Sequence, residues 1–227
     1  MKYELSGGVL PVIKVKLNTG DSVFNDNGSM IWRTGNVTME TNTKGGLLKG
    51  LARGFSGESV FMNTFTATNE NQEVAFATNM PGQIKVMDLN NTKNIVCQKG
   101  AFLVADHSVK LDVVFTKKFS AGLLGGEGFI LQKISGNGKC ALEIDGSLEE
   151  KNLNPGEILY VDQGNLAYFD ESVTYEIEMV KGFKNMVFGG EGLLLVKLTG
   201  PGNVGLQSLP LSNLAGQIKK YIPTSSK

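Results

Sequence analysis

The segment Glu191-Gly-Leu-Leu-Leu-Val-Lys-Leu-Thr-Gly is the strongest indicator of how this chain folds, because it occurs three times in diverged form. The two earlier copies are Glu58-Ser-Val-Phe-Met-Asn-Thr-Phe-Thr-Ala and Glu127-Gly-Phe-Ile-Leu-Gln-Lys-Ile-Ser-Gly. In each copy a glycine precedes the glutamate, apolar residues stand two to four positions after it, and a hydroxyl residue stands eight positions after it. Self-similarity at this spacing indicates that one structural unit is built three times.

A second element recurs between these copies, in which a glycine opens an apolar run and an aspartate follows six residues later. The glycines are Gly20, Gly100 and Gly156, and the aspartates are Asp26, Asp106 and Asp162. The outer copies share a later valine, Val37 and Val173, and the middle copy reaches Val109 eight residues sooner, as a shortened hairpin would. The sequence therefore predicts a single β-rich domain of three internal repeats, at about 1–80, 81–145 and 146–227.

Alternating apolar and polar residues predict strands in these repeats. Val173-Thr-Tyr-Glu-Ile-Glu-Met and Val109-Lys-Leu-Asp-Val alternate strictly, which is the period of a half-buried strand. Glycine makes up 29 of the 227 residues, as tight turns and bulges require. We therefore predict an all-β fold with a C-terminal helix over Ser212–Ile222, capped by Ser212, and short helical turns at Leu47–Arg53, Lys117–Leu123 and Lys181–Met186.

The composition excludes several classes of protein. With 41% hydrophobic and 19% charged residues, the chain is typical of a folded globular protein. Its 22 basic residues balance 22 acidic ones, whereas nucleic-acid-binding proteins usually carry a basic excess, so DNA is not an expected partner and RNA is disfavoured. No run is long enough for a membrane-spanning helix, and no signal-peptide or transit-peptide pattern is found, which favours a cytoplasmic protein that could associate with a membrane surface.

Residues that could support catalysis are few. His107 is the single histidine, which excludes zinc sites built on two histidines, and we interpret it as part of a turn beside Asp106 rather than as half of an acid–base pair. Cys97 and Cys140 lie in apolar surroundings and form no C-x-x-C pair, which predicts buried free thiols in a reducing compartment. The sequence therefore predicts no catalytic residue, no cofactor and no metal, and we expect a protein that is not an enzyme.

The repeated acidic residues are the candidate binding positions. If the repeats surround a pseudo-threefold axis, Glu58, Glu127 and Glu191 occupy equivalent places, where converging carboxylates could bind a cation or raise one another's pKa. Alternatively, each carboxylate accepts backbone N–H bonds at its own turn, and we favour this interpretation. The aspartates of the second element have the same two alternatives, with turn capping preferred.

Several motifs in order resemble the altered-inheritance-of-mitochondria (mitochondrial biogenesis) family. They are the run Lys44-Gly-Gly-Leu-Leu-Lys-Gly-Leu-Ala-Arg-Gly-Phe-Ser-Gly-Glu-Ser-Val-Phe, then Gly125-Gly-Glu-Gly-Phe-Ile-Leu-Gln-Lys, Tyr160-Val-Asp, Gly189-Gly-Glu-Gly-Leu and Gly200-Pro-Gly-Asn-Val-Gly-Leu-Gln-Ser. The resemblance spans nearly the whole chain. It departs from the family pattern at Ser56, where a second glycine is usual.

The resemblance implies an all-β fold of the double-stranded β-helix type, a β-sandwich grouped with the tryptophan RNA-binding attenuation protein, and assembly into oligomers. Eukaryotic relatives are tied to mitochondrial inner-membrane organisation, and the family brings no catalytic motif. We therefore expect a homo-oligomeric, non-enzymatic scaffold or interaction protein, with a protein partner or a membrane surface as its target. A small-ligand or RNA-binding module is the alternative, by analogy of fold with the attenuation protein.

Overall fold

The computed structural model describes residues 1–26, 28–42, 62–91, 93–117, 128–179 and 194–222. The strands of these residues are β1 (Lys2–Ser6), β2 (Val12–Leu17), β3 (Ser22–Asp26), β4 (Met30–Arg33), β5 (Val37–Asn42), β6 (Met62–Ala67), β7 (Gln72–Ala77), β8 (Gly82–Leu89), β9 (Ile95–Gln98), β10 (Phe102–Asp106), β11 (Val109–Lys117), β12 (Phe129–Gly136), β13 (Gly138–Asp145), β14 (Leu148–Leu153), β15 (Ile158–Asp162), β16 (Leu166–Asp170), β17 (Thr174–Met179), β18 (Leu194–Thr199) and β19 (Gly202–Gln207). The prediction of an all-β fold is therefore confirmed.

One α-helix, α1 (Leu211–Lys219), follows the last strand, as predicted for the C-terminal region. Its N-cap is Pro210 rather than Ser212, because the Pro210 carbonyl already accepts the N–H groups of Asn213 and Leu214 at 2.9 and 3.3 Å. The three predicted helical turns lie outside the described residues, apart from Lys117, which ends β11. Two 3-10 turns, Lys99–Ala101 and Gln163–Asn165, lead into β10 and β16.

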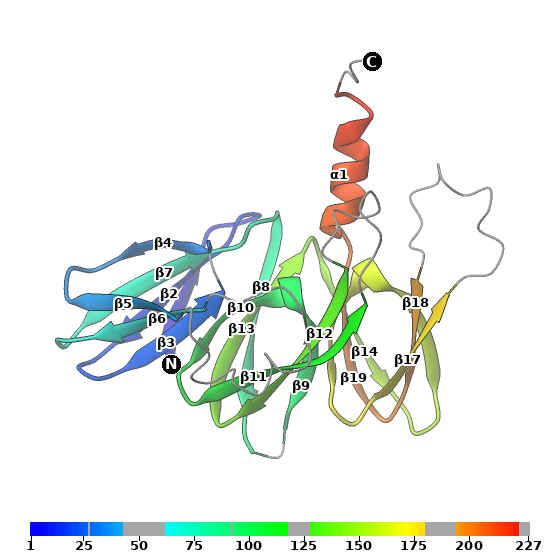
Figure 1. Ribbon diagram of the computed structural model, residues 1–227, viewed down its shortest axis with the longest axis horizontal. Coiled ribbons are helices and arrows are strands. Elements are labelled where there is room, and N and C mark those ends of the chain that lie inside the picture. The colour runs from blue at the N-terminus through cyan, green and yellow to red at the C-terminus, as the bar shows by residue number, and fades with distance from the viewer. Residues whose placement is uncertain (27, 43–61, 92, 118–127, 180–193, 223–227) are drawn as a thin grey trace.

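Four antiparallel sheets follow one another along the long axis of the molecule (Figure 1). The first sheet has the strand order β1-β2-β7-β4 and the second β5-β6-β3-β10-β13-β8. The third has the order β11-β12-β9-β16-β19-β14, and the fourth β15-β18-β17. The first and fourth sheets lie at opposite ends of the array (Figure 1).

The two inner sheets are each built from two half-sheets. We call the three-stranded units β5-β6-β3, β11-β12-β9 and β17-β18-β15 trailing halves. We call the units β4-β7-β2, β10-β13-β8 and β16-β19-β14 leading halves. In both inner sheets a trailing half is joined to the leading half that comes next along the chain, through β3–β10 and β9–β16. The same six-strand pattern thus occurs over β2–β7, β8–β13 and β14–β19.

Three hydrophobic cores fill the spaces between successive sheets. The first core contains Ile13 and Phe65, the second Ile95 and Leu142, and the third Phe129 and Val196, all of them at most 1% exposed. Strands such as β6 and β18 alternate buried and half-buried residues, because one of their faces meets a core. The central strands β10 and β16 instead have four consecutive buried residues, because they contribute side chains to two cores.

Candidate functional site

Large apolar side chains are exposed on edge strands at both ends of the array, and others are exposed on β1 (Tyr3 and Leu5), β5 (Met39) and β11 (Val114). In the described residues, β4 pairs only with β7 in the first sheet, and β15 pairs only with β18 in the fourth. Ile31 and Trp32 are exposed on β4, and Ile158 and Tyr160 are exposed on β15. We call these two strands with their exposed side chains the end edges, and they form the candidate site.

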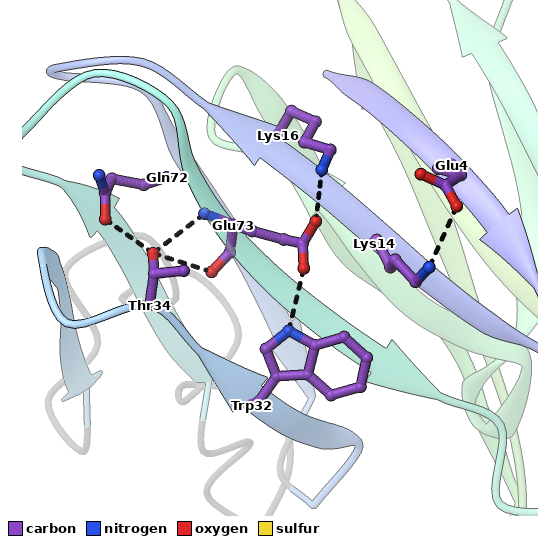
Figure 2. Close-up of polar contacts among 7 residues, drawn as sticks. All are labelled: Glu4, Lys14, Lys16, Trp32, Thr34, Gln72 and Glu73. Carbon is purple, nitrogen blue, oxygen red and sulfur yellow. Dashed lines mark hydrogen bonds and ion pairs between the residues drawn. The ribbon is translucent and has the colours of Figure 1, made fainter.

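Polar contacts fix the indole of Trp32 on the outer face of the first sheet, as Figure 2 shows. Its Nε1 donates a hydrogen bond of 3.0 Å to Oε1 of Glu73 on β7, and the other oxygen of that carboxylate accepts a bond of 2.6 Å from Lys16 on β2. Beside them, Lys14 pairs with Glu4 at 3.0 Å. The bond from Lys16, together with that from Trp32, lowers the pKa of Glu73, so this carboxylate stays charged and holds the indole in place.

Thr34, the residue that follows β4, joins this strand to β7 through hydrogen bonds. Its hydroxyl donates to Oε1 of Gln72 at 2.7 Å and accepts the backbone N–H of Glu73 at 3.1 Å (Figure 2). At the end of β4, the guanidinium of Arg33 donates to the Val37 carbonyl. The end edge of the first sheet is therefore held in a defined conformation by its own neighbours.

The end edge of the fourth sheet is less covered. Tyr160 lies opposite Lys197 on β18, and Lys197 pairs with Glu176 of β17 at 3.1 Å. Leu159, on the other face of the strand, is only half-buried although it packs against the third core. Its counterparts opposite Phe65 and Ile134, which are Val23 and Ile95, are fully buried.

The predicted acidic positions are only partly described. Glu58, Glu127 and Glu191 lie outside the described residues, as does the side chain of Asp26. Asp162 accepts the backbone N–H of Gly164 at 2.9 Å. Asp106 accepts the backbone N–H of Lys139 at 2.7 Å and pairs with the Met1 amino group at 2.9 Å. The two described carboxylates therefore bind backbone groups of the chain itself.

The structure corrects the expectation that Asp106 is equivalent to Asp26 and Asp162. Asp26 ends β3 and Asp162 ends β15, which are the same strand of their repeats, whereas Asp106 ends β10, one strand later. The counterparts of Asp106 are Thr34 and Asp170, whose side chains accept the equivalent N–H groups of β7 and β19. The strands β3 and β15 follow a glycine, and so does β10. The same six-residue spacing from glycine to aspartate therefore arises at two different places in a repeat. The predicted shortened hairpin before Val109 is therefore wrong.

His107 is exposed at the turn after β10, and its backbone N–H donates to the Ser22 carbonyl at 3.1 Å. It lines an open depression of about 1010 Å³ between the first and second sheets, together with Lys2, Lys16, Asp21 and Asp106. The Asp106 carboxylate is engaged by Lys139 and Met1, so these contacts do not orient it toward the imidazole. The depression offers both charges and polar groups to a small ligand.

Cys97 and Cys140 are buried free thiols, as predicted. Both belong to the second core. Burial raises the pKa of the Cys97 thiol far above its ordinary range, and it raises that of Cys140 to about 12. Neither thiol can form the reactive thiolate in the folded protein at neutral pH.

We expect dithiobis(nitrobenzoate) to label neither cysteine in the native protein and both after unfolding in guanidinium chloride. Labelling requires a thiolate and access of the reagent to the sulfur atom. Burial in the second core prevents both. The absorbance of released thionitrobenzoate measures the number of labelled thiols. Labelling of the native protein at the rate of free cysteine would contradict the burial of these two residues.

Sequence reasoning missed a buried carboxylate at Glu143, on β13. The side chain is 4% exposed and accepts the backbone N–H groups of Asn79 and Met80 at 2.5 and 2.9 Å. It thereby holds the segment that links β7 to β8. In the sequence Ala141-Leu-Glu-Ile, the glutamate stands between two apolar residues, as an exposed glutamate of a half-buried strand also would. The sequence therefore contains no signal for this role.

The fold and the candidate site together define a class of protein. In this class antiparallel sheets are stacked, three hydrophobic cores lie between them, and one end edge lies at each end of the stack. Within the described ranges, no three His, Cys, Asp or Glu side chains are grouped as they would be around a metal ion. Among the same residues, no helix has the length and apolarity that crossing a membrane would need.

The chain belongs to the family described as Mitochondrial biogenesis AIM24, which it matches over residues 3–209. It is 32% identical over 224 residues to an uncharacterized protein of Streptococcus pyogenes serotype M6, covering 95% of this chain and 88% of the relative. It is also similar to the crystal structure of a Streptococcus pyogenes protein that was a structural genomics target, with a TM-score of 0.79 and 28% identity. That match covers 97% of this chain and 99% of the other. The names of these two relatives state no enzymatic activity.

Proposed function

We propose that this chain is a non-enzymatic scaffold or interaction protein that binds its partners through the two end edges. The observation that carries this proposal is the exposure of Ile31 and Trp32 on β4 and of Ile158 and Tyr160 on β15, beside strand edges that pair with no other strand of the described residues. Soluble proteins usually protect such edges with charges, proline or a covering element, because an open edge pairs with other strands. Large exposed apolar groups at an open edge are typical of an interaction surface.

The polar chemistry described above supports a structural rather than a catalytic use of the acidic side chains. Asp106, Asp162 and Glu143 accept backbone N–H groups, and Glu73 holds Lys16 and Trp32. The buried free thiols fit a reducing compartment, and so we also propose a cytoplasmic location, with a membrane surface as one class of partner.

A small-ligand or RNA-binding module is the second candidate, in line with the resemblance to the tryptophan RNA-binding attenuation protein. The observation that favours it is the open depression between the first and second sheets, lined by Lys2, Lys16 and Asp21. Its mixed charges suit a small zwitterionic or polar ligand better than a nucleic-acid backbone, which would call for a basic surface.

Native mass spectrometry of the protein purified gently from its own host tests these alternatives. We expect an assembly held by protein–protein contacts, either of this chain alone or with another protein, and we expect lipid to be retained if a membrane surface is the partner. An assembly with a reproducible small-molecule mass would favour the second candidate. A bare monomer would overturn the proposed interaction function.

A further inference from the structure

The junction between repeats occurs twice in the chain with one register. At the first junction Val104, Ala105 and Asp106 lie opposite Asn25, Phe24 and Val23, and at the second Tyr168, Phe169 and Asp170 lie opposite Cys97, Val96 and Ile95. Both joining strands, β10 and β16, also have a register shift at the same place, between their first and third residues. The junction is therefore a repeated, specific element of the fold.

The end edges are the two unmatched halves of this junction. The strand β4 has the same register shift, between Met30 and Trp32, and occupies in the first repeat the place of β10 and β16. The strand β15 pairs with β18 as β3 pairs with β6 and β9 with β12, so it occupies the place of β3 and β9. Within the part of the chain that the structure describes, the first sheet has no trailing half and the fourth has no leading half.

The third core lacks the contribution that the next repeat makes to the other two. Leu103 and Val104 of the second repeat complete the first core, and Ala167 and Tyr168 of the third repeat complete the second core. No further repeat follows along the described chain to complete the third. The equivalent side chains are Ile31 and Trp32, which are 47% and 41% exposed at the other end of the molecule.

The first core lacks the reciprocal contribution. Phe24 of the first repeat reaches into the second core, and Val96 of the second repeat reaches into the third. The equivalent residue of the last repeat is Tyr160, which is 54% exposed. Each end of the molecule therefore presents the side chains that the opposite end lacks.

We propose that copies of this chain join head to tail, with β4 of one copy pairing antiparallel with β15 of a second copy. This inference rests on the proposed interaction function and names the partner. The internal register places Trp32 opposite Val161, Arg33 opposite Tyr160, and Thr34 opposite Leu159 of the second copy. The four strands of the first sheet and the three of the fourth then form one continuous sheet.

A second copy fits this surface better than any other occupant, because the two edges are complementary parts of a junction that the chain already makes twice. Closure within one chain is excluded by the placement of the first and fourth sheets at opposite ends (Figure 1). The register at the new junction puts the Arg33 and Tyr160 side chains on the same face of the joined sheet, where a cation–π contact would be favourable. The contact is heterologous, so it generates a ring or a filament rather than a twofold dimer.

Disulfide trapping tests the register directly. Arg33→Cys and Tyr160→Cys variants are purified separately, mixed and oxidised, and a covalent dimer on non-reducing gels is expected only from the mixture. Directly opposed Cβ atoms lie about 4.5–5.5 Å apart across an antiparallel pair, close to disulfide reach, whereas diagonal ones lie about 7–8 Å apart. Arg33→Cys mixed with Ile158→Cys is therefore the matched control and should not cross-link. The buried native thiols do not compete.

The oligomeric state supplies a second, independent measurement. By light scattering coupled to gel filtration, the wild type should be an oligomer, and Trp32→Lys and Tyr160→Lys should each weaken assembly by at least about tenfold. Val114→Lys, which changes an equally exposed apolar residue on β11 of the third sheet, should leave assembly unchanged. Circular dichroism verifies that all three variants remain folded.

Cross-linking of both mixtures alike, of either single variant alone, or of neither mixture would overturn the head-to-tail junction. A monomeric wild type would overturn it as well. If the monomer still binds a different protein in the native assembly measurement, the interaction function stands while the self-pairing proposal fails. If it binds nothing, both fail together.

Discussion

Replacing Gly205 with alanine should lower the free energy of unfolding by about 3 kcal/mol, at the upper end of the usual cost of overpacking a core. Gly205 lies opposite Tyr168 in the β16–β19 pair, and a Cβ at this position would stand 2.1 Å from Cε1 of the tyrosine ring. The ring is 1% exposed and its hydroxyl donates to Glu150, so it has no room to turn aside. Urea unfolding followed by circular dichroism measures the loss.

The second repeat contains the matched control for this substitution. There Ala141 stands opposite Val104, and both side chains are fully buried, so a Cβ is accommodated when the facing residue is small. Tyr168→Val should therefore relieve Gly205→Ala. The double variant should lose less than the sum of the single losses by about 2 kcal/mol. Strict additivity would show that the ring of Tyr168 is not what excludes a side chain at position 205.

The same comparison of repeats shows which parts of the fold can be predicted from the sequence. Phe65, Ile134 and Leu198 each stand seven positions after the glutamate in the three copies quoted above, and the structure places all three in equivalent, fully buried positions. Apolar side chains that face a core recur with the strand period, and this recurrence survives divergence of the repeats. The alternating strands and the all-β class follow from the same signal.

The predicted equivalence of the aspartates was wrong in the middle repeat, because turns and strand lengths recur within a repeat as well as between repeats. Gly100 and Asp106 have the right spacing but flank β10, whereas Gly20 and Asp26 flank β3. The end edges were also beyond prediction. Which half-sheet joins which depends on pairing between residues such as Val104 and Asn25, far apart in the chain, and no local pattern of residues encodes it.

Removing the Glu143 carboxylate should be the other strongly destabilising change. Its oxygens accept the backbone N–H groups of Asn79 and Met80 and, at 3.2 Å, the amide of the Asn79 side chain. Leucine would fill a similar volume but leave these donors without an acceptor, and we expect a loss of about 2–3 kcal/mol in the free energy of unfolding. Glutamine keeps one acceptor oxygen and should lose about 1 kcal/mol. Equal losses for the two variants in urea unfolding would show that packing, not hydrogen bonding, is what the residue contributes.

The pH dependence separates the charge of Glu143 from its hydrogen bonds. Burial raises the pKa of this carboxyl above its ordinary value of 4.5, although the N–H groups of Met80 and Asn79 act in the opposite direction. The folded protein therefore binds the proton more tightly than the unfolded chain does. Its contribution to stability is fully present below pH 4.5 and is lost as the pH rises through the raised pKa.

Glu143→Gln cannot titrate, so the stability of the wild type minus that of this variant should fall as the pH rises from about 4 to 7. Ion pairing with lysine lowers the pKa of Glu73 and Glu171, but these two groups are present in both proteins and cancel in the difference. Burial also raises the pKa of Asp145, and the charge of Asp145 raises the pKa of Glu143, so the difference contains Glu143 together with its coupling to Asp145. Urea unfolding of the two proteins at matched pH and salt gives the curve. A difference that stays flat or grows with pH would mean that Glu143 is stabilised in its charged form, and that its N–H donors outweigh its burial.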